Sequence, residues 1–233
     1  MNIVDKVPEM VNIENVLISV SDKSGIEGFI RELIDINPEV NIFSTGGTYR
    51  ALEASLADWK GGAFRDNLKS VSDYTGQPEM QGGLVKTLDF RIYLGLLSEP
   101  YNDHHAADLR RTDSMYIDMV VVNLYPFAKQ VATPGNTLER ARSHIDIGGP
   151  TMLRASAKNY IRVASVCDPD DYPRLIRELR EADGSLSLET RFALAKKTFA
   201  HTAAYDAGII EYLNGCEPDE LAAAYQVKPG AWK

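Results

Sequence analysis

The stretch Val16-Leu-Ile-Ser-Val-Ser-Asp-Lys-Ser-Gly25 indicates the fold of this chain, because an apolar run leads directly into a polar loop that ends in glycine. Apolar side chains then recur at helical spacing over Ile26–Ile34, so we predict a strand, a loop and a helix. The pattern repeats when Val40-Asn-Ile-Phe43 leads into Ser44-Thr-Gly-Gly-Thr48 and an expected helix over Tyr49–Leu56. Two such units in succession predict a parallel sheet with ligand-binding loops at the carboxyl ends of its strands.

The rest of the chain continues the alternation of strands and helices. Ile117–Val122 is the most strand-like run, and Arg162–Val166 is a further predicted strand. Further helices are predicted over residues 137–144, 151–158, 170–181 and 188–213. We therefore expect one α/β domain over residues 1–233, with an N-terminal tail over 1–15 and a helical C-terminal extension over about 187–233.

The composition narrows the class of protein. The 233 residues include 44% hydrophobic and 25% charged residues, values that suit a globular protein with a substantial core. The formal net charge of -8 argues against a protein that binds nucleic-acid polymers, because a phosphate backbone favours a basic surface. A site for a single phosphate needs only a few local cations and is compatible with this charge.

Other features of the sequence set an expectation for the location of the protein. No apolar stretch is long enough to span a bilayer, and residues 1–15 lack the apolar core of a signal peptide. Cys167 and Cys216 show no CxxC spacing, so we expect reduced thiols. These features predict a cytoplasmic protein that does not contact membranes.

Two polar loops are candidates for a phosphate site. In the first, Ser21 and Lys23 lie at an expected helix start, where backbone N–H groups stabilise an anion. In the second, Thr45-Gly-Gly-Thr48 combines hydroxyl groups with glycines that let the backbone approach a ligand. Each loop alone is more typical of a capped helix or a tight turn. Together, on neighbouring strands, they indicate an anion or phosphate site as readily as two structural turns.

Polar side chains also follow the strongest strand. Asn123 and Tyr125 come directly after Ile117–Val122, and α/β proteins place ligand-binding side chains at the end of a central strand. The two residues lie two positions apart, which puts them on one side of an extended segment. A tyrosine ring packed beneath a loop, with its hydroxyl group paired, explains the pattern equally well.

Two lysines and an aspartate are candidates for catalysis. Lys86 follows Gly82-Gly83 and could polarise a carbonyl group, although most lysines are simply solvated. Asp146 and Lys158 could transfer a proton if they formed a pair in a dry cleft. A structural ion pair between them fits the spacing at least as well.

No pattern in the chain is typical of a metal or cofactor site. The histidines lack HExxH or Cys/His ligand spacing, and the GxSxG, Walker and GxGxxG motifs are absent. We therefore expect neither a bound metal nor a cofactor.

Taken in order, these segments resemble the inosinate cyclohydrolase domain of the bifunctional purine-biosynthesis family. The resemblance extends from about Val16 to about Tyr212. The matching segments are residues 19–25, 44–48, 71–76, 78–80, 85–88, 121–127, 145–151, 154–159 and 201–206. Each segment is short, and it is the ordered set that makes the resemblance specific.

The resemblance implies a methylglyoxal-synthase-like fold, with three layers and a mostly parallel sheet. The residues it implies as catalytic are Lys86, Tyr125, Asp146 and Lys158. The residues it implies as substrate-binding are Ser21, Lys23, Thr45, Gly46, Gly47, Thr48, Thr87, Asn123, Ile147, Gly148 and Gly149.

The resemblance also implies a reaction and partners. The substrate would be 5-formamidoimidazole-4-carboxamide ribonucleotide, whose carboxamide nitrogen attacks the formyl carbon so that water leaves and inosinate (IMP) forms. Such an enzyme aligns the two groups, removes a proton and stabilises an oxyanion. We expect a homodimer, and a separate formyltransferase upstream, because the family's formyltransferase domain has no counterpart in this chain.

The chain departs from the family pattern at three places. The family usually has arginine where Leu84 stands and a His-Pro pair where Asp89-Phe90 stands, and residues 59–67 resemble an insertion. We expect Arg91 to replace the missing cation. The departures keep open a non-catalytic module that binds or senses a purine nucleotide. A lyase of the methylglyoxal-synthase type is disfavoured, because its arrangement of carboxylates and histidine is not found.

Overall fold

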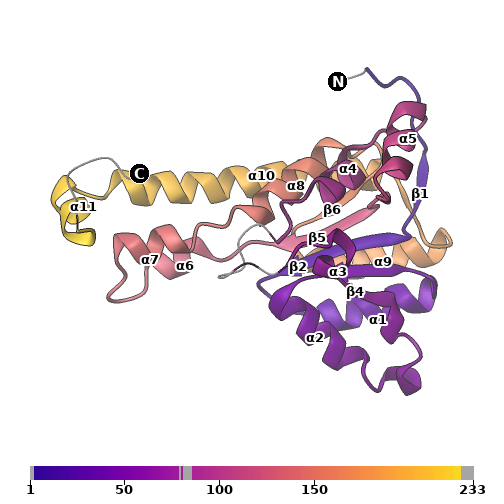
Figure 1. Cartoon of the computed structure of the whole chain (residues 1–233), viewed down its shortest axis with the longest axis horizontal. Coiled ribbons are helices and arrows are strands. Elements are labelled where there is room, and N and C mark those ends of the chain that lie inside the picture. The colour runs from indigo at the N-terminus through magenta and orange to yellow at the C-terminus, as the bar shows by residue number, and fades with distance from the viewer. Residues whose placement is uncertain (1–2, 79, 81–85, 227–233) are drawn as a thin grey trace.

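The core of the computed structural model is a five-stranded parallel sheet with the strand order β4-β3-β2-β5-β6 (Figure 1). The strands are β2 (Asn15–Val20), β3 (Asn41–Ser44), β4 (Leu68–Ser70), β5 (Met119–Asn123) and β6 (Ala164–Val166). The structure describes residues 3–78, 80 and 86–226. Strands β2, β3, β5 and β6 lie where the sequence predicts strands, and the predicted α/β class with a parallel sheet is confirmed.

Strands β2 and β5 lie at the centre of the sheet. Met119 to Val122 are all buried, which explains why β5 reads as a continuous apolar run. In the register of the sheet, Val20 pairs with Asn123 of β5 and Ile18 pairs with Ser44 of β3. The loops that follow β2, β3 and β5 therefore begin at the same edge of the sheet.

Helices cover both faces of this sheet. The helices are α1 (Ile26–Ile36), α2 (Gly46–Leu56), α3 (Val71–Thr75), α4 (Phe90–Leu97), α5 (Asp103–Arg111), α6 (Phe127–Val131), α7 (Leu138–Ser143), α8 (Gly148–Lys158), α9 (Tyr172–Glu181), α10 (Leu188–Asn214) and α11 (Pro218–Ala224). Alternate β2 residues Val16 and Ile18 join one core cluster with α1, α2 and α9, whereas Leu17 joins a second cluster with α4 and α8. The alternation of side chains along β2 thus separates two cores and gives three layers.

Two helices begin earlier than the sequence predicts. The helix predicted from Tyr49 begins at Gly46, and the helix predicted from Thr151 begins at Gly148. Glycine is a poor helix former, so the periodic pattern placed both glycine pairs in loops. In the structure these glycines form the first turns of α2 and α8.

The region between β3 and β5 holds helices that the sequence pattern did not predict. Helix α4 begins after Asp89, whose Oδ1 atom accepts a hydrogen bond from the Arg91 N–H (2.8 Å). The side chain of Asp89 is buried and also accepts from Gln77 Nε2 (2.5 Å). The departure at Asp89 is therefore a helix cap, and a cap of this kind typically contributes about 1 kcal/mol.

The expectation of an N-terminal tail over residues 1–15 is wrong for its last part. Met10–Asn12 form strand β1, which pairs antiparallel with β7 (Ser185–Ser187). Ile13 is completely buried. The pairing joins segments about 175 positions apart, and three-residue strands leave no periodic signal that a sequence pattern could register.

The C-terminal extension is dominated by α10, a helix of 27 residues. Its first part packs against α8 and β6, and later residues contact α6, while α11 contacts α7. Figure 1 shows α6, α7, α10 and α11 projecting together on one side of the body. None of the helices in the described ranges combines the length and the apolar character needed to cross a membrane.

Candidate active site

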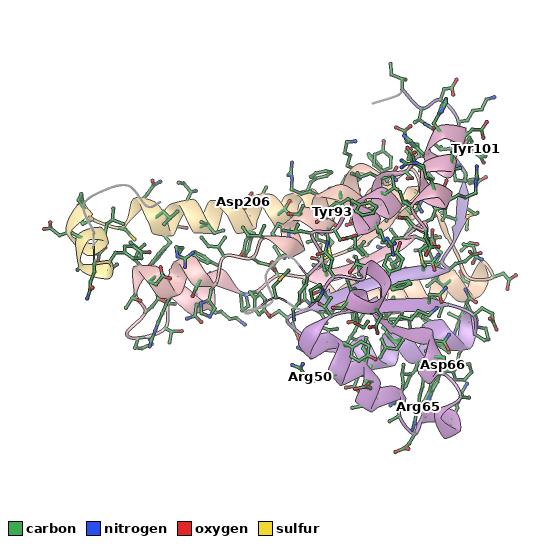
Figure 2. The ribbon with its side chains drawn as sticks, viewed as in Figure 1. Arg50, Arg65, Asp66, Tyr93, Tyr101 and Asp206 are labelled. Atoms are coloured by element: carbon green, nitrogen blue, oxygen red, sulfur yellow. The ribbon has the colours of Figure 1, made fainter. Side chains whose placement is uncertain are left out.

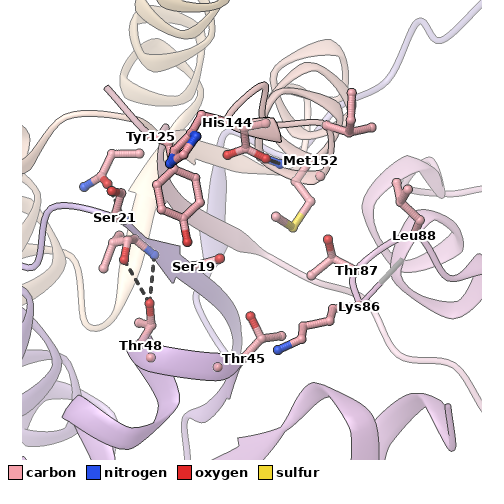
Figure 3. Close-up of a pocket in the computed structure, with 18 of the residues that line it drawn as sticks. Ser19, Ser21, Thr45, Thr48, Lys86, Thr87, Leu88, Tyr125, His144 and Met152 are labelled. Atoms are coloured by element: carbon pink, nitrogen blue, oxygen red, sulfur yellow. Dashed lines mark hydrogen bonds between the residues drawn. The ribbon is translucent and has the colours of Figure 1, made fainter. Parts of the chain in front are cut away.

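A cavity of about 660 Å³ lies at the carboxyl edge of the sheet, where the loops after β2, β3 and β5 meet (Figure 3). The residues that line it come from segments 19–23, 45–50, 86–88, 123–125 and 143–152. Every predicted site residue except Lys158 lies on this wall. The fold thus brings together residues as far apart in sequence as Ser19 and Met152, and three parallel strands that end side by side contribute to this.

The side chain of Asn123, at the end of β5, holds the loop after β2 in place. Its Oδ1 atom accepts hydrogen bonds from the backbone N–H groups of Ser21 (2.7 Å) and Asp22 (2.9 Å). Its Nδ2 group donates to the Asp22 carbonyl oxygen (2.8 Å). Because its amide makes three hydrogen bonds to the protein backbone, Asn123 fixes the shape of the loop that carries Ser21.

The loop predicted after β3 is the first turn of α2. The Thr48 hydroxyl donates to the Val20 carbonyl oxygen (3.0 Å) and accepts from the Val20 N–H (3.1 Å), which ties α2 to β2 (Figure 3). Gly46 has a φ of 53°, in the left-handed region that favours glycine. The backbone N–H groups of this turn and the positive end of the helix dipole therefore lie on the cavity wall.

Cationic side chains surround this turn. A Cβ atom on Gly46 would lie 3.5 Å from Lys86 Nζ, and a Cβ atom on Gly47 would lie 4.0 Å from an Arg50 guanidinium nitrogen. Figure 3 shows Lys86 pointing toward Thr45 at the start of α2. Lys23 Nζ donates to two carbonyl oxygens of its own loop at 3.4 Å. The helix N-terminus together with Lys23 and Arg50 suits a phosphate group, and Lys86 Nζ borders the same turn on the side of the remaining cavity.

Sequence reasoning missed Arg50. It lines the cavity from α2, and Figure 2 shows it at the edge of the body that this helix forms. In the sequence nothing distinguishes it from the other arginines of the chain, and most arginines are solvated. The only signal was its position two residues after Thr48, which becomes informative once α2 is known to start at Gly46.

The expectation for Arg91 is corrected. Arg91 is absent from the cavity wall, and its guanidinium donates to the Tyr74 carbonyl oxygen (2.8 Å). Arg91 follows the N-cap of α4, and that position directs it toward α3 instead of the cavity. Arg50 is the arginine that the fold brings to the site. Leu84, where the family usually carries arginine, lies outside the described residues.

Asp146 stands on the wall that the start of α8 forms. Its Oδ1 atom accepts from the Gly149 N–H (3.0 Å), and its own N–H donates to the Tyr205 hydroxyl (2.8 Å). Burial raises the pKa of the Asp146 carboxyl group, and the hydrogen bond from Gly149 partly opposes this shift. A Cβ atom on Gly149 would lie 2.5 Å from Asp146 Oδ2, and one on Gly148 would lie 2.8 Å from Thr87 Oγ1. The glycine pair therefore lets Asp146 and Thr87 approach the helix.

Tyr125 and His144 form the outer part of the wall (Figure 3). Tyr125 is 58% exposed, so the alternative of a ring packed beneath a loop is wrong. The Nδ1 atom of His144 lies 2.7 Å from the Arg140 carbonyl oxygen, which places a proton on Nδ1. Sequence reasoning missed His144, because a single histidine without ligand spacing carries no signal.

Lys158 does not share the cavity with Asp146, so the expected pair is not formed within one chain. Lys158 is the last residue of α8 and is exposed, whereas the cavity is lined by the first turn of that helix. Eleven residues at about 1.5 Å each separate the two ends of α8 by roughly 15 Å. Asp146 and Lys158 are twelve positions apart, so they could pair only if the chain between them bent back on itself.

Two family models match consecutive parts of this chain. The model described as MGS-like domain matches residues 25–151, and the model described as AICARFT/IMPCHase bienzyme matches residues 156–230. A curated relative, the "Bifunctional purine biosynthesis protein PurH" of Acidithiobacillus ferrooxidans, is 46% identical over 210 residues. This match takes in 90% of the chain and 38% of the relative, so the chain spans about two fifths of the length of that protein.

A solved structure has a similar fold over nearly its whole length. The structure titled "Crystal structure of ForH" superposes with a TM-score of 0.69 and 31% sequence identity. The superposition covers 85% of this chain and 97% of that chain. Since the MGS-like model alone matches more than half of the 233 residues, this chain belongs to the MGS-like domain family and, within it, is related to PurH.

Proposed function

We propose that this chain is an IMP cyclohydrolase, which closes the second ring of the purine nucleotide from 5-formamidoimidazole-4-carboxamide ribonucleotide. One observation carries the proposal: a single cavity holds a cationic helix N-terminus at one wall and Lys86, Tyr125 and Asp146 around the remaining space. The first feature suits the ribose phosphate, and the second suits a proton transfer next to a developing oxyanion. The match to the AICARFT/IMPCHase bienzyme over residues 156–230 supports the same reaction.

The phosphate is assigned to the start of α2. The N–H groups of the turn at Gly46 and Gly47, the Thr45 hydroxyl, Lys23 and Arg50 lie on this part of the wall. A phosphate makes similar contacts in the ground state and the transition state, so this part of the site contributes mainly to binding. The purine ring then extends toward Asp146 and Tyr125, on the other lining segments of the cavity.

The chemical step forms a bond between the carboxamide nitrogen and the formyl carbon. The formyl oxygen leaves as water and takes one proton from each of the two nitrogens. An amide nitrogen is a weak nucleophile, so the site must hold the two groups in contact and accept the proton of the attacking nitrogen. Asp146 is assigned as the proton acceptor, since burial raises its pKa and makes its carboxylate a stronger base than an exposed one.

The developing oxyanion is assigned to Lys86 and Tyr125. Both line the cavity, and a cation or a hydroxyl donor at that position stabilises negative charge in a water-poor site. The Gly149 N–H already donates to Asp146, so a backbone contribution is assigned to Gly148. Thr87, whose hydroxyl approaches Gly148, is assigned as a substrate contact on the same side.

The proposal includes partners and a location. The formylated substrate must be supplied by a formyl-transfer reaction, because the formyl carbon is the atom that the ring closure consumes. A homodimer and a cytoplasmic location complete the proposal. Light scattering of the purified chain tests the first of these, and a mass of one chain at micromolar concentration would contradict the homodimer.

The function is tested by adding the formamido ribonucleotide to the purified chain and following IMP by its absorbance. We expect turnover, and we expect Lys86→Ala to lower kcat by about a hundredfold, because one preorganised charge is lost. Leu97→Ala, at an exposed residue that does not line the cavity, is the control and should retain the rate. Binding of IMP without any turnover would contradict the proposal and favour a sensing module.

A further inference from the structure

The cavity and the C-terminal helix α10 belong to different matched parts of the chain. Among the residues that the structure describes, those that line the cavity lie between Ser19 and Met152, a stretch that overlaps the MGS-like match over 25–151. Helix α10 lies entirely within the match to the AICARFT/IMPCHase bienzyme over 156–230. Any influence of α10 on the chemistry must therefore act through a residue of the cavity wall.

One side chain of α10 makes such a contact. The Tyr205 hydroxyl accepts a hydrogen bond from the Asp146 backbone N–H at 2.8 Å, across 59 positions of sequence. Its ring lies edge-on to Phe127, with ring centroids 6.4 Å apart, and is partly buried against the core cluster that contains Leu17. Asp206, its neighbour in sequence, is seen in Figure 2 near the point where α10 leaves the body.

The contact fixes the residue that the chemistry needs. The Asp146 backbone is held by Tyr205, and its carboxylate is held by the Gly149 N–H at 3.0 Å. Because Gly149 has no Cβ atom, the Asp146 carboxylate can lie directly beside the first turn of α8. With one bond at the main chain and one at the side chain, Asp146 is fixed at both ends. A reacting group that is displaced by about 1 Å can lose a hundredfold in rate.

We propose that Tyr205 is a positioning residue for Asp146, through which the C-terminal segment sets the geometry of the MGS-like cavity. The inference rests on the proposed function and deepens it, since it assigns a role to a helix that does not line the cavity. The hydroxyl of Tyr205 does not touch the substrate. It acts by holding the N–H of Asp146, which would otherwise lose its partner on a half-buried segment.

The chain offers a matched control on the same helix. Tyr212 also packs edge-on against Phe127, with centroids 5.8 Å apart, but its hydroxyl accepts from Asn136 Nδ2 at 3.3 Å. Tyr205→Phe and Tyr212→Phe therefore remove the same atom from the same helix and leave both rings against Phe127. Only the first removes a bond to the cavity wall.

We measure kcat and KM for both variants, together with the backbone amide exchange of Asp146. We expect Tyr205→Phe to lower kcat by about tenfold with KM changed by less than about twofold, because the loss of one hydrogen bond acts on Asp146 and not on the phosphate contacts. We also expect faster exchange of the Asp146 amide. Tyr212→Phe should keep kcat and the exchange rate of the Asp146 amide at wild-type values. The two variants should have similar melting temperatures.

The outcomes separate this inference from the proposed function. An inactive wild-type chain contradicts the proposed cyclohydrolase function. The role of Tyr205 is then decided by the exchange rate of the Asp146 amide alone. Equal exchange in both variants, or unchanged kcat in Tyr205→Phe, overturns the inference while cyclohydrolase activity stands. A rise in KM without a fall in kcat would also overturn it, since that pattern indicates a binding role.

Discussion

The two ends of helix α8 differ sharply, although the same family resemblance marks both. At the first end, Gly148 and Gly149 lie on the cavity wall beside Asp146. At the other end, Asn159 Nδ2 donates to the carbonyl oxygens of Leu96 (2.7 Å) and Ser98 (3.0 Å), far from the cavity. A motif match therefore identifies a residue but does not place it. The eleven residues of α8 are enough to separate the end that we propose to be functional from the structural end.

The structural end gives the largest expected effect. Arg162 lies just beyond α8, and its guanidinium pairs with Asp118 at 2.9 Å with both side chains buried. Asp118 also accepts from the backbone N–H groups of Glu14 and Asn15, yet burial raises its pKa to about 6. We expect Arg162→Met to lower the free energy of unfolding by about 3 kcal/mol or more, because a buried carboxylate loses its partner.

The effect of Arg162→Met should depend on pH. Since the pKa of Asp118 is raised in the folded state, ionisation of this group lowers stability as pH rises through about 6. Without Arg162 the charged form is still less favourable, so urea denaturation should show a larger loss at pH 8 than at pH 5. The double variant with Asp118→Asn should recover part of the loss. Equal stability of Arg162→Met and wild type at pH 8 would show that this end of α8 is not structural.

The functional end should show the opposite behaviour in Asp146→Asn. We expect kcat to fall by about a hundredfold, because the amide cannot accept the proton. The unfolding free energy at neutral pH should rise, because burial raises the pKa of Asp146 and ionising this group in the folded chain costs stability. The gain should vanish as pH falls below the ordinary range of Asp, where the wild-type carboxyl is protonated in both states.

Two measurements check this prediction on the same protein. Steady-state kinetics give kcat, and urea denaturation at several pH values gives the stability difference. As pH is lowered, the wild-type kcat should begin to fall at a pH above the ordinary pKa of Asp, because the raised pKa of Asp146 means that the base loses its charge earlier. If Asp146→Asn were both slower and less stable at neutral pH, Asp146 would have a structural role like those of Asn159 and Arg162.

Two arginines extend the comparison to the phosphate wall. Arg50 approaches Gly47 at the start of α2, whereas Arg91 is bonded to the Tyr74 carbonyl oxygen. We expect Arg50→Ala to weaken IMP binding by about tenfold with little change in kcat, because phosphate contacts act on binding. Arg91→Ala is the matched control and should keep the affinity while it lowers stability. Calorimetric titration with IMP measures the affinity of each variant. A larger loss of affinity in Arg91→Ala than in Arg50→Ala would support the expectation from sequence that Arg91 replaces the missing cation.

The sequence predicted the part of the site that follows from local patterns. Ser21 and Thr45 come directly after apolar strands, so the rule that parallel strands end at one edge was sufficient to bring their loops together. Arg50 and His144 could not be found in this way, since neither belongs to a motif. Tyr205 depends on a contact across 59 positions, and such contacts are set by tertiary packing.

The same reasoning explains the errors at the ends of elements. Glycine pairs read as loops, although at Gly46 and Gly148 they are first helical turns, because tertiary contacts outweigh helix propensity. That error also removed the one positional signal for Arg50, which is its place in the first turns of a helix that starts at Gly46. It also hid the length of α8, on which the position of Lys158 depends.

The smallest effect is expected for Lys158→Ala, and it tests the comparison directly. Lys158 is exposed at the structural end of α8, roughly 15 Å along the helix from the turn that lines the cavity. A charge at that distance in water is screened, since the Debye length is about 8 Å at physiological salt. We therefore expect kcat to change by less than about threefold, whereas Lys86→Ala loses about a hundredfold.

The experiment also distinguishes two ways in which the comparison could fail. If Lys158→Ala lost as much activity as Lys86→Ala, the cavity of one chain would be incomplete. Mixing inactive Lys86→Ala with inactive Lys158→Ala would then decide the matter. Recovered activity in the mixture would place Lys158 in the cavity of a second copy, because each mixed dimer would hold one intact site. No recovery would mean that α8 bends in the working enzyme and that its two ends act on one substrate.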